Sequence, residues 1–236
     1  MTILAVLACL GTVRADEVTI GDGGTSSSAF LPTFDFYNYS LTQQIYTATE
    51  LGAAGTITSI AFKNTTDGTD YTRNLKVYIQ LSDKEQFSGG DWVPMSESDL
   101  VFSGDVTFTV GEWVTIDFDT PFVYDGSSNI ILCVADNTGS YQQSPHIACL
   151  TFSAESMAIY AYRDNGSYDV NAPGVNGTVS NAKNQIVLNI TPSSTPVVPK
   201  PKTPTNLAYS SDCHLCHTEL DRERHCHQLA DMSERR

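Results

Sequence analysis

Basic residues are scarce in this 236-residue sequence, which has 13 Lys and Arg against 27 Asp and Glu. Between Asp16 and Pro199, six basic residues stand against 21 acidic ones, so this stretch carries a formal charge of −15. Nucleic acids and anionic membrane surfaces attract clusters of Lys and Arg, and no such cluster is present here. We therefore expect neither as a partner, and a cation, a neutral glycan or a basic protein surface stays open.

No apolar run in the sequence is long enough to span a bilayer. The run from Ile3 to Leu10 is too short for this, and it leads to Val13-Arg14-Ala15, which has small residues where a signal peptidase reads. We predict a signal peptide over residues 1–15, a secreted or cell-surface location, and no membrane insertion of the mature chain. Lipoprotein processing at Cys9 and a structured N-terminal strand are the alternatives.

Catalytic motifs are missing as well. His146 is the only histidine before residue 214, and no serine lies in a Gly-x-Ser-x-Gly turn. His146 is too close to Cys149, on one predicted strand, for a papain-like pair. No two acidic residues stand out as the carboxylates of a glycoside hydrolase. The sequence therefore predicts a protein that is not an enzyme.

Cysteine is rare in the part of the chain that we expect to fold. Only Cys133 and Cys149 lie between residues 16 and 191. They stand on two apolar runs separated by residues 136–145, as in a hairpin, so a disulfide is geometrically possible and export permits it. Free cysteine is also frequent in protein cores. Both alternatives stay open.

Apolar and polar residues alternate with a period of two in several stretches of the sequence. Residues 75–81 and 113–118 alternate in this way, and residues 129–135 form a continuous apolar run, as in a central strand. Turn residues separate the runs, and no helical period exceeds a turn or two. We predict about ten strands over residues 16–191, in an all-β fold: a two-sheet antiparallel β-sandwich with jelly-roll-like connections.

The C-terminal part differs in composition. Residues 192–204 hold five of the ten prolines, which predicts a semi-rigid linker. Residues 209–236 are rich in Cys, His and Arg and lack an apolar pattern. When the codons of Asp212–Asp221 are read one nucleotide later, however, the genetic code permits a strand-like string rich in Thr, Ile, Ala and Val. We predict a disordered tail over residues 205–236 that is the truncated, frameshifted start of a fibronectin type III domain. A zinc site around Cys213 and Cys216 is the alternative.

Two kinds of binding residue stand out in the predicted loops. Asp22 lies in a glycine-rich loop, and Asp67 and Asp70 share an acidic one; such loops bind calcium, although neither has EF-hand spacing. Nine aromatic residues could supply a platform for sugar rings. Trp92 and Tyr141, set among polar residues, are the best candidates for exposure. The nine are Phe34, Phe36, Tyr37, Tyr39, Trp92, Tyr141, Tyr160, Tyr162 and Tyr168.

Several stretches resemble a β-sandwich accessory module that precedes fibronectin type III domains in secreted and surface proteins of Gram-negative anaerobic bacteria. Pro204-Thr205-Asn206-Leu207 also resembles the opening of a fibronectin type III domain. The resemblance implies a jelly-roll-like sandwich in an accessory role, and it brings no catalytic residues. The stretches that carry it are residues 36–46, 55–62, 100–104, 119–126 and 136–140.

These observations favour a non-catalytic extracellular adhesion or structural module of a longer protein, with a glycan or a protein as its ligand. The alternative is a carbohydrate-binding module of a secreted glycan-degrading or proteolytic enzyme. A stacked aromatic pair on one exposed face would favour this alternative. No cofactor other than calcium is expected.

Overall fold

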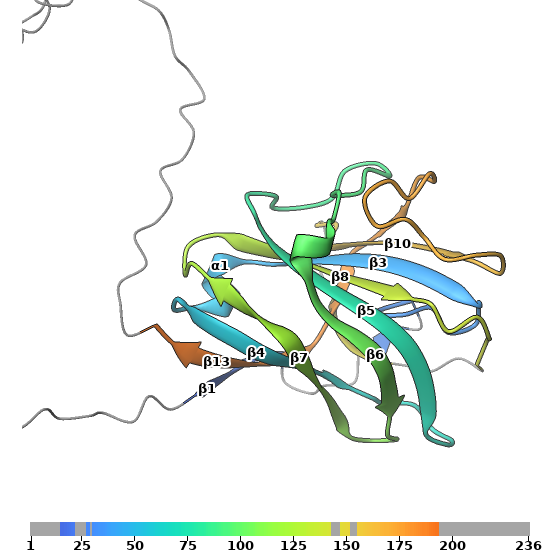
Figure 1. Ribbon diagram of the computed structural model, residues 1–236, viewed down its shortest axis with the longest axis horizontal. Coiled ribbons are helices and arrows are strands. Elements are labelled where there is room, and N and C mark those ends of the chain that lie inside the picture. The colour runs from blue at the N-terminus through green and yellow to red at the C-terminus, as the bar shows by residue number, and fades with distance from the viewer. Residues whose placement is uncertain (1–14, 22–26, 29, 143–146, 152–154, 194–236) are drawn as a thin grey trace, which may run out of the picture. The chain divides into compact units, whose positions relative to one another are not determined.

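The computed structural model describes residues 15–21, 27–28, 30–142, 147–151 and 155–193. Within these ranges the chain is almost entirely β-strand, and the helices are a single turn, α1 (Ala48–Leu51), and a 3-10 turn, η1 (Glu97–Asp99). The all-β antiparallel sandwich predicted from the alternating pattern is therefore confirmed (Figure 1). No helix in the described part of the chain is long and apolar enough to cross a membrane. The predicted signal peptide (except residue 15), most of the linker and the tail lie outside the described residues.

Two antiparallel sheets make up most of the fold. The first has four strands, in the spatial order β1 (Asp16–Ile20), β13 (Ile186–Pro192), β4 (Gly55–Lys63) and β7 (Trp113–Tyr124). The second has six, in the order β11 (Thr178–Ser180), β10 (Ala158–Arg163), β3 (Tyr39–Tyr46), β8 (Asn129–Asp136), β5 (Tyr71–Ser82) and β6 (Leu100–Phe108).

The connections follow a jelly roll. The eight principal strands, in chain order, are β1, β3, β4, β5, β6, β7, β8 and β13. Numbered 1 to 8 in that order, they lie as 1-8-3-6 in one sheet and 2-7-4-5 in the other, so the chain repeatedly changes sheet. The first and last of them are neighbours, with Asp16 opposite Ile190 and Ile20 opposite Ile186.

A third, small sheet was not expected from the sequence. It contains β12 (Ala182–Asn184), β9 (Ile147–Thr151) and β2 (Ser27–Ser28). Its strands have two to five residues, which is too short for a period-two pattern to stand out.

The main core lies between the two large sheets. It is built from alternate residues, so that Leu75, Val77 and Ile79 of β5 and Val114 and Ile116 of β7 all point inward. Such burial of apolar surface is the dominant stabilising contribution to a fold of this kind.

The six-stranded sheet is buried on its other face too. Alternate residues of β8 belong to two separate clusters, and Ile131 and Cys133 lie in the second one. Phe87, Met95 and Tyr168, which lie outside the strands, cover that cluster. Burial on both faces explains why β8 reads as a continuous apolar run rather than as an alternating one.

Candidate functional site

Seven aromatic residues form one continuous group of ring contacts, which we call the aromatic strip. Its members come from β10, from the loop that follows β8 and from the segment that leads into β3. Tyr160 and Tyr162 lie on β10 at alternate positions and therefore share a face. Tyr141 follows β8, which pairs with β3 on the other side. The strip consists of Phe30, Phe34, Phe36, Tyr37, Tyr141, Tyr160 and Tyr162.

The rings of the strip are close enough for direct aromatic interaction. Contacting ring centroids are 4.2–6.5 Å apart. Phe30 stacks on Tyr160 at 4.9 Å with an interplanar angle of 17°, and the ring of Tyr37 lies 4.2 Å from that of Tyr162. Offset and edge-on contacts of this kind are the favourable arrangements for aromatic pairs. The contacts therefore hold the rings in fixed positions relative to one another without a ligand.

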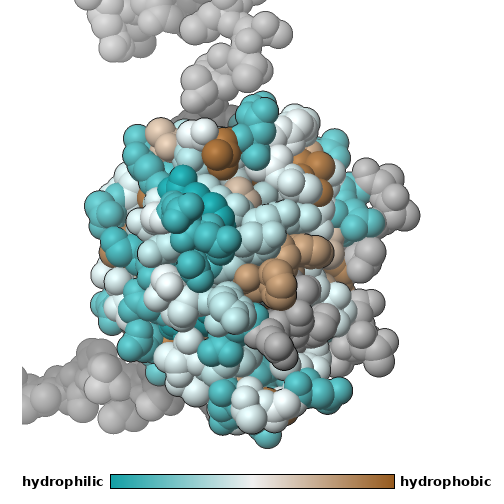
Figure 2. Space-filling view, turned by 90° about the vertical axis from the view of Figure 1, so that its right-hand side faces the viewer, coloured by the Kyte–Doolittle hydropathy of each residue, from teal (hydrophilic) through white to brown (hydrophobic). Residues whose placement is uncertain are grey.

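Several rings of the strip are open to solvent. Tyr141 is 66% exposed, Phe36 is 52% exposed, and their centroids are 6.5 Å apart. Tyr162 and Phe30 are 41% and 38% exposed. On the face shown in Figure 2, hydrophobic residues gather in small patches among neutral and hydrophilic ones. Exposed large apolar side chains that contact one another, as Phe36 and Tyr141 do, mark binding surfaces more often than scattered ones do.

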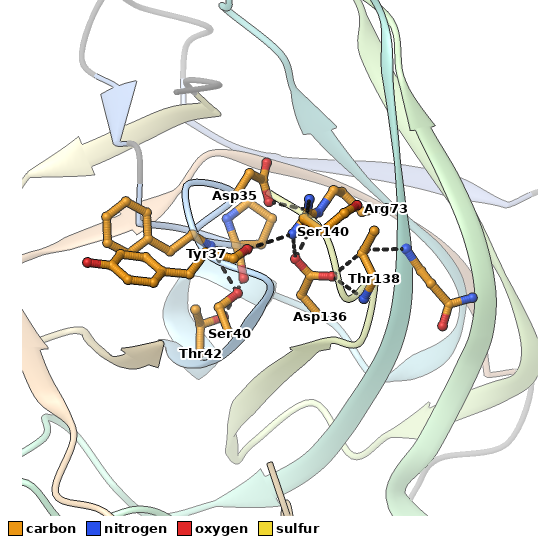
Figure 3. Close-up of polar contacts among 11 residues, drawn as sticks. Asp35, Tyr37, Ser40, Thr42, Arg73, Asp136, Thr138 and Ser140 are labelled. Atoms are coloured by element: carbon orange, nitrogen blue, oxygen red, sulfur yellow. Dashed lines mark hydrogen bonds and ion pairs between the residues drawn. The ribbon is translucent and has the colours of Figure 1, made fainter. Parts of the chain in front are cut away.

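A buried guanidinium lies next to the strip (Figure 3). Arg73 of β5 is completely buried, and its Nε donates to Asp136 Oδ2 at 2.8 Å, while Nη2 donates to the same oxygen. Its Nη1 donates to the backbone oxygen of Ser140 at 2.7 Å, and Nη2 also donates to that of Tyr37 at 3.2 Å. Asp35 Oδ1 lies 3.2 Å from Arg73 Nε, as an ion pair without hydrogen-bond geometry.

The two carboxylates of this cluster differ in their surroundings. Asp136 Oδ1 accepts hydrogen bonds from Thr138 N at 2.9 Å and Thr138 Oγ1 at 2.5 Å. Asp35 is buried, and burial raises its pKa; the positive charge of Arg73 opposes this rise and the negative charge of Asp136 adds to it, so that the pKa of Asp35 is about 6. A carboxyl with this pKa changes its charge near neutral pH.

This cluster was not predicted from the sequence, although a signal for it exists. Arg73 falls in the inward register of β5, together with Tyr71 and Leu75. An arginine at an inward position requires buried acidic partners, because an isolated buried charge is very costly. The partners themselves, Asp35 and Asp136, are far away in the sequence and lie beside Arg73 only in the folded chain.

The two aromatic residues singled out from the sequence lie in different surroundings. Tyr141 belongs to the strip and contacts Phe36. Trp92 is half-buried, packs on the second apolar cluster, and donates its Nε1 hydrogen to the backbone oxygen of Val175 at 2.9 Å. Nothing in the ring contacts joins Trp92 to the strip within the described part of the chain. The exposed ring beside Tyr141 is therefore that of Phe36 and not that of Trp92.

The acidic loop proposed for calcium is solvent-exposed. Asp67 and Asp70 are both exposed, and Asp70 Oδ1 accepts a hydrogen bond from Val110 N at 2.9 Å. Asp22 lies outside the described residues. Among the residues that the structure describes, no group of three or more His, Cys, Asp or Glu side chains is placed to hold a metal ion.

Cys133 and Cys149 are both free and buried. Cys133 lies in the second apolar cluster, while the thiol of Cys149 lies 3.4 Å from Asn184 Nδ2 in the small third sheet. Burial raises the pKa of each thiol to about 12. The sequence left open a disulfide and two free core cysteines, and the structure has two free core cysteines.

A second buried charge lies away from the strip. Lys183 of β12 is completely buried, and its Nζ donates to Glu50 Oε1 and Oε2 at 2.6 and 2.7 Å and to the backbone oxygen of Ile45 at 3.1 Å. The same nitrogen lies 4.9 Å from the centroid of the Tyr46 ring. Glu50 also caps α1 by accepting a hydrogen bond from Thr47 N at 2.8 Å. This pair joins α1 to the small sheet.

No protein-family profile matches this chain, and neither a curated protein nor a solved structure is significantly similar to it. Function must therefore be inferred from the residues and their geometry.

Proposed function

We propose that this chain is a non-catalytic extracellular adhesion module of a longer surface or secreted protein, and that it binds its ligand on the aromatic strip. The observation that supports this is the group of partly exposed rings, of which Phe36 and Tyr141 are the most exposed. Aromatic side chains provide large contact areas at low entropic cost, which is why they dominate binding surfaces. The resemblance to accessory modules that precede fibronectin type III domains agrees with this role.

A carbohydrate is the ligand that this surface favours. Aromatic ring faces pack against the apolar C–H faces of sugar rings, and neighbouring polar groups bind the sugar hydroxyls. Ser140 and Gln142 flank Tyr141 and are exposed, and Asn38 lies next to Tyr37. The acidic composition of the module disfavours a polyanionic ligand. An adhesion module and a carbohydrate-binding module of an enzyme would use the same strip, and they differ in the protein to which the module is joined.

The test is a glycan array probed with the module and with the double variant Phe36→Ala/Tyr141→Ala. We expect the wild type to bind a restricted set of neutral glycans, and the double variant to bind the same glycans at least about tenfold more weakly, because each truncation removes an exposed stacking face. Titration calorimetry with the best glycan measures the difference.

The matched control is Val123→Ala. Val123 is 64% exposed on β7, in the other large sheet, so its truncation should leave glycan affinity unchanged. Equal affinity of the wild type and the double variant would show that the strip is not the binding surface. If the wild type binds a protein surface but no glycan, the carbohydrate part of the proposal is wrong.

A further inference from the structure

The loops that carry the two most exposed rings are tied to one buried side chain. Arg73 donates to the backbone oxygens of Tyr37 and Ser140, which directly follow Phe36 and directly precede Tyr141. These are charge-assisted hydrogen bonds from a rigid, planar group, so they fix both direction and distance. The position of each exposed ring relative to the other therefore depends on Arg73, whose bonds to Tyr37 and Ser140 are drawn in Figure 3.

Asp35 joins the same two loops by a second route. It stands between Phe34 and Phe36 in the chain, and its backbone oxygen accepts a hydrogen bond from Gln142 N at 2.6 Å, just after Tyr141. Its carboxylate faces Arg73 at 3.2 Å. A change in the charge of this carboxylate therefore acts at the point where the two loops meet.

The charges in this cluster are not balanced. Asp35 and Asp136 face the single guanidinium of Arg73, and all three side chains are at most 1% exposed. With both carboxylates ionised the cluster carries one net negative charge, and a single proton neutralises it. The other groups that face Asp35 are the hydroxyl groups of Thr33 and Tyr71, which are neutral near pH 7.

We infer that Arg73 and Asp35 are positioning residues of the aromatic strip, and that uptake of one proton by Asp35 changes the arrangement of Phe36 and Tyr141. Protonation removes the ion pair between Asp35 and Arg73, while Arg73 keeps its bonds to Asp136. The segment around Phe36 then loses one of its ties to the loop of Tyr141. The pKa of Asp35, which burial raises to about 6, brings this event close to neutral pH.

The test needs no ligand. Aromatic ring resonances respond to the positions of neighbouring rings, so the signals of Phe36 and Tyr141 are followed by NMR in protein labelled at Phe and Tyr, from roughly pH 4.5 to pH 8. We expect both signals to move together with a single midpoint near pH 6. Signals that stay constant over this range would overturn the inference, and this measurement uses only the unaltered protein.

The variant Asp35→Asn separates positioning from folding. It removes the titrating group at nearly constant volume, so we expect its ring signals to stay at the wild type's low-pH positions and to be independent of pH. The control Asp125→Asn removes a carboxylate in the turn that precedes β8, at the other end of that strand from Asp136, and should leave the titration intact. Titration that persists in Asp35→Asn would assign the proton to another group and overturn the inference.

The consequence for binding rests on the proposed function. If a glycan binds the strip, its affinity should fall as the pH decreases through about 6, and Asp35→Asn should bind with the low-pH affinity at every pH. If no glycan binds while the ring signals still titrate, the proposed ligand is wrong and the coupling of the strip to Asp35 stands. The two proposals therefore fail separately.

Discussion

Replacing Ile116 by aspartate is expected to unfold the domain. Ile116 is 2% exposed and points from β7 into the core between the two large sheets. The new carboxylate would be buried without a partner, and the lost packing of the isoleucine sec-butyl group adds to its cost. We expect a loss of at least about 4 kcal/mol of unfolding free energy, which is comparable with the whole stability of a domain of this size. Urea unfolding followed by circular dichroism measures it.

The matched control is the preceding residue of the same strand. Thr115 is exposed on the opposite face of β7, so Thr115→Asp introduces the same charge into solvent. Its cost should stay within about 0.5 kcal/mol. If Ile116→Asp unfolds at the same urea concentration as Thr115→Asp, then the inward register of β7 is wrong.

Replacing Glu50 by glutamine is expected to have the second largest effect. The substitution keeps an oxygen that can accept from Thr47 N, but it removes the negative charge of the carboxylate to which the buried ammonium of Lys183 is hydrogen-bonded. Removing one partner of a buried ion pair costs about 3–5 kcal/mol. We expect a loss near the lower end, about 3 kcal/mol, because Glu50 itself is 25% exposed and water reaches it. Thermal and urea unfolding measure the loss.

Lys183→Met provides the contrast. It removes the buried charge and fills the space with an apolar chain, and the carboxylate that remains is the one that solvent reaches. We therefore expect Lys183→Met to cost clearly less than Glu50→Gln, since a buried pair replaced by apolar groups is often close to neutral. Equal costs for the two variants would mean that the buried ammonium is not the reason for the loss.

The pH dependence of stability distinguishes the two carboxyl groups. Burial raises the pKa of Glu50, but the hydrogen bonds from Lys183 and Thr47 outweigh it and hold this pKa below its usual value. Glu50 therefore contributes stability that is present above pH 4.5 and is lost as the pH falls through its lower, folded-state pKa. Asp35 acts in the opposite sense, because its raised pKa gives stability that is present below pH 3.8 and is lost as the pH rises through about 6. Glu50→Gln should abolish the loss of stability at acidic pH and leave the loss of stability that occurs as the pH rises through about 6.

The sequence predicted the strands well where one face is buried. Leu75, Val77 and Ile79 were expected on one face and are almost completely buried. Leu81 was expected to join them but is 42% exposed. The ladder between β5 and β6 ends at Tyr78 with a register shift, and the last residues of β5 extend beyond it. A period of two carries no information on where a neighbouring strand ends.

The candidate site was less accessible to prediction. Most residues of the strip were recognised as aromatic candidates, and Tyr141 is exposed as predicted. The exposure of Phe36 and Phe30 was not predicted, because it depends on loops rather than on a repeating pattern. Trp92 stands among polar residues and is nevertheless half-buried against Val175. Phe36 directly follows Asp35, whose side chain is buried, and Phe36 is nevertheless half-exposed. The side chain of Asp35 points inward because it faces Arg73. Arg73 is far from Asp35 in the sequence, so no local pattern could predict this contact.

The pairing of β1 with β13 affects how the folded domain responds to tension. The two strands are antiparallel, with Asp16 beside Ile190, so the chain enters and leaves this sheet at the same end. A force that separates Asp16 from Pro192 therefore acts across the hydrogen bonds of this ladder rather than along the strands. Such a force breaks the hydrogen bonds in succession, starting at the pair of Asp16 and Ile190 and ending at the pair of Ile20 and Ile186. Under load we expect the domain to open first at β1, while β3, β8 and β10, which lie beside the aromatic strip, keep their pairing.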